Sequence, residues 1–90
     1  MKKVRITISG RVQGVGFRYS ARRQAAHVQV NGYVRNLPGG DVEIVAEGEA
    51  ANVDEMVDWA RKGPTWASVT QVEVKEEPAE GEFYDFGVWL

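Results

Sequence analysis

The sequence has 90 residues, of which 43% are hydrophobic and 27% charged, a composition that excludes disordered, collagenous and membrane-spanning classes and predicts one small domain over residues 1–90. It has no cysteine and one histidine, His27, so a disulfide framework, a thiolate zinc site and a cysteine nucleophile are excluded. Metal chemistry is therefore short of ligands, so we expect no metal; we also expect no cofactor. No apolar run approaches the roughly 18 residues of a membrane span, and the N-terminus lacks a signal-peptide core, so we expect a cytoplasmic protein with no membrane partner.

The formal net charge of −2 conceals an uneven distribution along the chain. Residues 1–45 hold eight basic and two acidic side chains, whereas residues 46–90 hold three basic and eleven acidic ones. Such charge asymmetry suggests that the first half of the chain binds an anionic ligand. The alternative is a solvated surface on which the signs are mixed in three dimensions.

Hydrophobic periodicity predicts the elements in the first half of the chain. Alternating apolar residues predict a strand over residues 4–8, and apolar steps of four, four and three predict a helix from Phe17 to Val28. Apolar residues alternate again from Val28 to Asn36 and once more from Val42, which predicts two further strands. The turn-forming residues 37–41 predict that these two strands form an antiparallel hairpin.

The second half repeats this pattern of helix and strand. An amphipathic helix is predicted after Gly48, with its acidic residues early in the helix, where the dipole favours them, and a stop at Gly63-Pro64. Strands follow around residues 70–74 and 84–90. The order β, α, β, β, α, β with a short closing strand is typical of a ferredoxin-like α+β fold, a split βαβ sandwich with one antiparallel sheet and two helices on one face.

A glycine-rich stretch separates the first strand from the first helix. It lacks the lysine and hydroxyl of a Walker loop and the third glycine of a dinucleotide-binding fingerprint. Glycines can nevertheless curl the backbone until its N–H groups point inward beside those of a helix N-terminus, which favours an anion; the alternative is a tight connection and nothing more. The candidate phosphate-binding residues are Val12, Gln13, Gly14, Val15, Gly16, Phe17 and Arg18.

Arg18 falls in the first turn of the predicted helix. A cation there opposes the helix dipole by about 0.3–1 kcal/mol. A phosphate carrying about −1.5 to −2 charges would reverse that sign, and the planar guanidinium can bind two of its oxygens. The loop and Arg18 together predict a phosphate site; the alternative is that Arg18 extends into solvent.

Two segments resemble the signatures of the acylphosphatase family: residues 10–18, Gly-Arg-Val-Gln-Gly-Val-Gly-Phe-Arg, and residues 32–42, Gly-Tyr-Val-Arg-Asn-Leu-Pro-Gly-Gly-Asp-Val, with the second motif ending at Gly48. The resemblance covers nearly the whole chain. It implies a ferredoxin-like fold and metal-independent hydrolysis of acyl phosphates to carboxylate and inorganic phosphate. It also implies that Arg18 binds the phosphoryl group and that Asn36 positions the attacking water as the second catalytic residue.

One position departs from the family pattern. The family commonly has a glycine near the end of the first helix, where this chain has Gln29. A left-handed cap would strain glutamine, so we expect the helix to end differently. His27, beside it, is expected to be a surface or partly packed residue without a catalytic role, and the three tryptophans are expected to pack, with Trp66 and Tyr19 as candidates for the border of the site entrance.

Two other functions compete with hydrolysis. The same topology carries RNA-binding sheets, but Gly16-Phe17-Arg18-Tyr19 does not continue into the aromatic RNP1 pattern. The second competitor is a catalytically silent phosphoanion-binding or regulatory domain. We expect a small-molecule acyl phosphate as substrate, inorganic phosphate as product, no nucleic-acid partner and a monomer.

Overall fold

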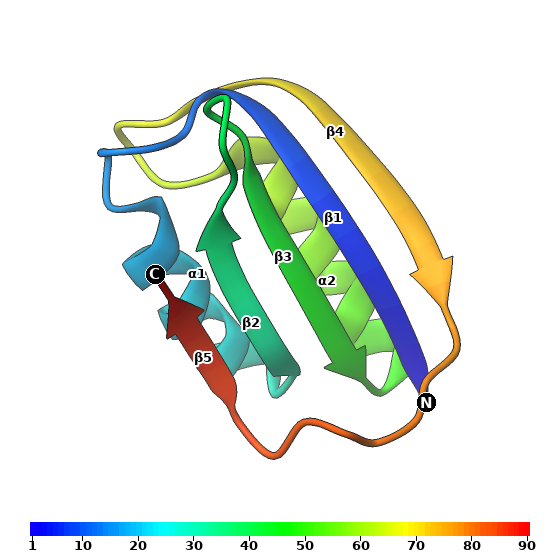
Figure 1. Ribbon diagram of the computed structural model, residues 1–90. Coiled ribbons are helices and arrows are strands. Elements are labelled where there is room, and N and C mark those ends of the chain that lie inside the picture. The colour runs from blue at the N-terminus through cyan, green and yellow to red at the C-terminus, as the bar shows by residue number, and fades with distance from the viewer.

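The computed structural model describes all 90 residues, and its strands and helices follow the predicted order (Figure 1). In chain order the elements are β1 (Lys2–Arg11), α1 (Phe17–Val28), β2 (Asn31–Asn36), β3 (Val42–Gly48), α2 (Ala50–Lys62), β4 (Ser68–Glu77) and β5 (Phe86–Trp89). Neither helix has the length and hydropathy needed to cross a lipid bilayer.

The sheet has the strand order β4-β1-β3-β2-β5, and both helices cover one of its faces (Figure 1). The pairs β1–β3, β1–β4 and β2–β3 are antiparallel, which confirms the ferredoxin-like arrangement. The expectation of a purely antiparallel sheet is wrong for β5, which pairs with β2 in parallel. The reason is that residues 78–85 run along the end of the sheet where β4 stops and β2 starts, so β5 enters in the direction of β2 (Figure 1).

The core lies between the sheet and the two helices. The predicted helical face is confirmed, because Phe17, Ala21, Ala25 and Val28 of α1 are all buried. They pack with the inward residues of the strands and with Val53, Met56 and Ala60 of α2 in a single cluster of 16 buried residues. Removing this apolar surface from water holds the start of α1 firmly on the sheet.

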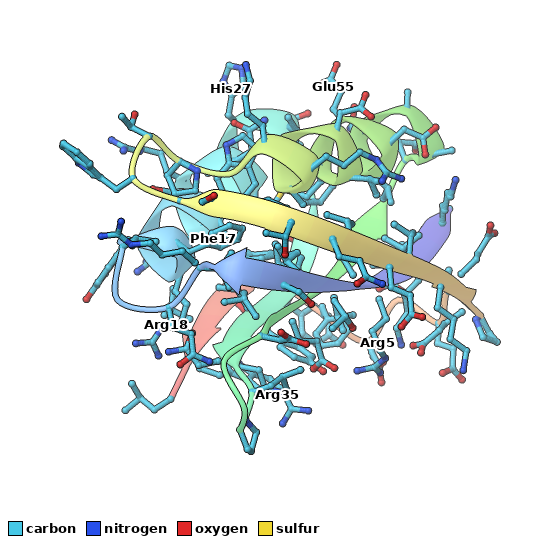
Figure 2. All side chains as sticks on the ribbon, turned by 90° about the horizontal axis from the view of Figure 1, so that it is seen from above. Arg5, Phe17, Arg18, His27, Arg35 and Glu55 are labelled. Carbon is cyan, nitrogen blue, oxygen red and sulfur yellow. The ribbon has the colours of Figure 1, made fainter.

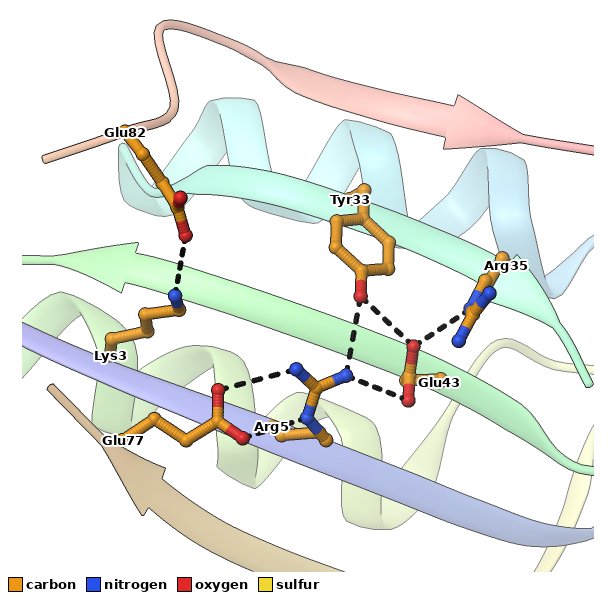
Figure 3. Close-up of polar contacts among 7 residues, drawn as sticks. All are labelled: Lys3, Arg5, Tyr33, Arg35, Glu43, Glu77 and Glu82. Carbon is orange, nitrogen blue, oxygen red and sulfur yellow. Dashed lines mark hydrogen bonds and ion pairs between the residues drawn. The ribbon is translucent and has the colours of Figure 1, made fainter. Parts of the chain in front are cut away.

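The open face of the sheet carries a hydrogen-bonded network of charged side chains (Figure 3). Arg5 on β1 donates to Glu43 at 3.0 Å and to Glu77 at 2.8 Å. Arg35 donates to Glu43 at 2.8 Å, and the Tyr33 hydroxyl donates to the same carboxylate at 3.1 Å. Burial opposes the charged form of Glu43, but hydrogen bonds from Arg35, Arg5 and Tyr33 outweigh it and lower the pKa of Glu43.

These ion pairs account for part of the charge asymmetry along the sequence. Lys2 pairs with Asp54 at 2.9 Å and Lys3 pairs with Glu82 at 2.6 Å. With Arg5 and Arg35, four of the eight basic residues of the first half therefore have acidic partners. The basic residues of that half without an ion pair are Arg11, Arg18, Arg22 and Arg23.

Two expectations about helix ends are wrong. Helix α1 does end in a left-handed cap, because Gln29 adopts φ 60° and ψ 54° and its N–H donates to the carbonyl of Ala25. The turn into β2 requires this geometry, and glutamine accepts the strain that glycine would avoid. Helix α2 starts at Ala50, so Asp54 and the acidic residues after it lie beyond its first turn, which holds none.

Candidate active site

The loop between β1 and α1 is shaped by two glycines with left-handed backbone angles. Gly14 has φ 75° and Gly16 has φ 77°, and Gly16 is the N-cap of α1 without any side-chain hydrogen bond to the helix. As a result, none of the backbone N–H groups of residues 13–19 donates to another group of the protein. We call this segment of free donors, residues 13–19, the cradle. Clustered free N–H groups at a helix N-terminus attract an anion.

A hollow of about 160 Å³ opens beside the cradle. It is lined by Val12, Gly14, Gly16, Phe17, Arg18, Tyr19 and Asn36. Tyr19 stands exposed at its rim, whereas the ring of Phe17 is 2% exposed and packs edge-on against Trp59. Phe17 therefore belongs to the core and can contribute only its backbone to the hollow.

Arg18 is held by the last strand of the sheet. Its Nη1 donates to the carbonyl oxygen of Trp89 on β5 at 3.0 Å. Figure 2 shows Arg18 at the loop end of α1, beside β5. The guanidinium has five N–H bonds, so the remaining donors stay available to a ligand in the hollow. The expectation that Arg18 faces a phosphate-sized site therefore has a geometric basis.

β5 is anchored by stacked aromatic rings. The ring of Trp89 lies 3.7 Å from that of Tyr33 on β2, with an interplanar angle of 6°. This contact holds in place the strand whose carbonyl orients Arg18. The sequence analysis expected Trp89 to pack but missed its contact with Arg18, because the alternation over residues 84–90 indicates a strand without indicating its neighbours.

Asn36 reaches the hollow from the end of β2, opposite Val42 of β3. Its carboxamide makes no hydrogen bond to the protein. The adjacent turn is tied to the cradle by Gln13, whose Nε2 donates at 2.9 Å to each of the carbonyl oxygens of Leu37 and Asp41. The β2–β3 hairpin and the loop before α1 thus form one rigid unit.

The remaining sequence candidates lie outside the hollow. The side chain of Gln13 donates hydrogen bonds to the hairpin, and Val15 lines a different hollow. His27 is exposed in the last turn of α1, away from the site. Trp66 is 74% exposed, so the expectation that it is a packing residue is wrong, and it does not line this hollow. No cluster of three or more His, Cys, Asp or Glu side chains is arranged to hold a metal ion.

Comparison with known proteins identifies the family. The acylphosphatase family model matches residues 4–88. An acylphosphatase from Methylococcus capsulatus is 50% identical over 88 residues, covering 98% of this chain and 96% of the relative. The crystal structure of acylphosphatase from Bacillus subtilis superposes with a TM-score of 0.95 at 34% identity and full coverage of both chains. T. kodakarensis HypF matches with a TM-score of 0.86 at 34% identity, over 100% of this chain but only 12% of that longer one. With its cradle, Arg18 and Asn36 gathered at one hollow, the chain belongs to the acylphosphatase family.

Proposed function

We propose that the cradle and Arg18 bind the phosphoryl group of an acyl phosphate while Asn36 orients the water that attacks it. The overall activity follows from the family, whose model matches residues 4–88 and whose member from Methylococcus capsulatus is 50% identical: the chain hydrolyses acyl phosphates to carboxylate and inorganic phosphate. The observation that supports the assignment of roles is the shared hollow, which is lined by cradle residues, Arg18 and Asn36.

The electrostatics of the hollow suit a phosphoryl group. An acyl phosphate has a carboxylate leaving group, which departs without a strong general acid. The phosphoryl group passes through a loose transition state, so the protein mainly supplies position and hydrogen-bond donors for the equatorial oxygens. The cradle N–H groups and the free N–H bonds of Arg18 fill that role without any rearrangement of the backbone.

Asn36 completes the scheme with a neutral group. Its carboxamide oxygen can accept a proton of the attacking water and hold the water in line with the leaving oxygen. The proton then passes to a phosphate oxygen of the substrate, since no carboxylate or imidazole lines the hollow. The rate therefore depends on placement of the water rather than on a titrating side chain.

The test is replacement of Asn36 by alanine. We expect Asn36→Ala to lose about 10²–10³-fold in turnover of benzoyl phosphate while inorganic phosphate still binds and inhibits, because the cradle is unchanged. Asn31→Ala is the matched control, since Asn31 lies on the same strand but donates to the carbonyl of Phe83 at its other end. Loss of turnover and of phosphate binding together would show that Asn36 is structural.

We propose further that the chain acts as a cytoplasmic monomer without a nucleic-acid partner. The burial of Phe17 against Trp59 supports the last point, because this ring cannot stack on a base. The open sheet face also carries the Arg5–Glu43 network, and its Tyr33 and Trp89 rings are stacked on each other. A salt-dependent gel shift on single-stranded RNA would contradict this view, and sedimentation equilibrium would reveal any dimer.

A further inference from the structure

A second and larger hollow lies on the far side of the cradle loop. Its volume is about 380 Å³, and its walls come from α1, α2 and the loop between α2 and β4. That loop and the one before α1 meet at the same end of the molecule in both views (Figures 1 and 2). The lining residues are Val15, Ser20, Arg23, Gln24, Trp59, Pro64, Thr65 and Trp66. The proposed hydrolysis uses none of these side chains.

One basic side chain lines the second hollow. Arg23 is the one charged residue in its lining, and it forms no ion pair or hydrogen bond within the protein. Helix α1 as a whole has three arginines and no acidic residue, so nothing on this helix offsets the field of Arg23. A single cation facing an open hollow favours a ligand with one negative charge.

The same hollow has an aromatic wall. Trp66 lines the hollow and is 74% exposed, although tryptophan is usually highly buried on average. Trp59 forms a second aromatic surface and is held in place by the ring of Phe17, 5.2 Å away. Amide and hydroxyl groups of Gln24, Ser20 and Thr65 provide polar contacts beside these rings.

We propose that the second hollow binds a small aromatic carboxylate, with its ring stacked on Trp66 and its carboxylate paired with Arg23. The single charge of Arg23 matches a carboxylate, whereas the doubly charged phosphoryl group is matched by the several donors of the cradle. Val15 links the two hollows, since it lines the second hollow and its neighbours Gly14 and Gly16 line the first. A bound carboxylate therefore contacts the loop that holds the phosphoryl group.

The probe is 2-naphthoate, titrated into the ¹⁵N-labelled protein at pH 7 with saturating inorganic phosphate in the first hollow. We expect the indole N–H signals of Trp66 and Trp59 to shift while that of Trp89 stays in place. Arg23→Gln and Trp66→Ala should each weaken binding at least about fivefold. Arg22→Gln is the matched control, because Arg22 is next to Arg23 in the sequence but lines a different hollow. The affinity of this variant for 2-naphthoate should stay within about twofold of the wild type.

Two further ligands separate the two interactions. Neutral 2-naphthamide tests the carboxylate and cyclohexanecarboxylate tests the ring, and both should bind more weakly than 2-naphthoate. The proposal is overturned if Arg23→Gln binds 2-naphthoate as tightly as the wild type, or if inorganic phosphate competes with it. It is also overturned if Arg22→Gln weakens binding as much as Arg23→Gln, which would indicate a diffuse charge effect. None of these outcomes bears on the assignment of Arg18 and Asn36.

Discussion

Replacement of Arg18 by glutamine separates its role in catalysis from its role in the fold. In the structure the Arg18 guanidinium donates one N–H bond to the Trp89 carbonyl, and its other N–H bonds remain free for a ligand. Two charge-assisted hydrogen bonds to phosphoryl oxygens, each worth about 1.5–3 kcal/mol, are lost in Arg18→Gln. We therefore expect a loss of about 3–4 kcal/mol of transition-state stabilisation, or two to three powers of ten in kcat/KM.

The effect of the same change on stability should be small. Loss of the hydrogen bond to Trp89 destabilises the fold by about 1 kcal/mol. Removal of a cation from the first helical turn stabilises it by about 0.3–1 kcal/mol, because that cation opposes the helix dipole. The two effects nearly cancel, so urea unfolding of Arg18→Gln should resemble that of the wild type.

The assay is release of inorganic phosphate from benzoyl phosphate at pH 7. Arg22→Gln is the control on the same helix, since Arg22 is exposed, lies outside the hollow and has no ion pair. Arg18→Lys should fall between wild type and Arg18→Gln, because lysine keeps the charge but loses the planar fork. A folded Arg18→Gln protein that retains kcat/KM within about tenfold of wild type would refute this account of the site.

Three further changes test the parts that support the site. Gln13→Ala removes both hydrogen bonds between the cradle and the hairpin, so we expect a loss of about 1–2 kcal/mol in the free energy of unfolding and a lower kcat; an unchanged urea midpoint would contradict this. Gln29→Gly relieves the left-handed strain and should stabilise the fold by about 0.5–1 kcal/mol, whereas Gln29→Ala should not. Glu43→Gln should destabilise the fold by about 1–2 kcal/mol at pH 7. Because the pKa of Glu43 is lowered on folding, its stabilisation exists above its unfolded pKa of about 4.3 and is lost as the pH falls through the folded pKa. The free energy of unfolding, measured with urea between pH 3 and 7, should thus change less with pH in Glu43→Gln than in the wild type. The same pH dependence in both proteins would disprove this role of Glu43.

Local sequence patterns determined most of the elements of this protein. The apolar spacing of α1 matches its bounds from Phe17 to Val28, and Gly63-Pro64 ends α2 as predicted. The glycines before α1 and Arg18 after them indicated an anion site. Both the free N–H groups of the loop and the cation in the first helical turn depend on residues close in sequence. Asn36 is different, since on its own it resembles an ordinary turn residue and only the family resemblance pointed to it.

Tertiary structure alone decided how these parts meet. The parallel pairing of β5 with β2, the Trp89 carbonyl that orients Arg18 and the link from Gln13 to the hairpin all join residues far apart in the chain. The strain accepted by Gln29 likewise follows from the path that the chain must take into β2. Periodicity reports which face of an element is buried, but strand order and register depend on long-range packing that no local pattern contains.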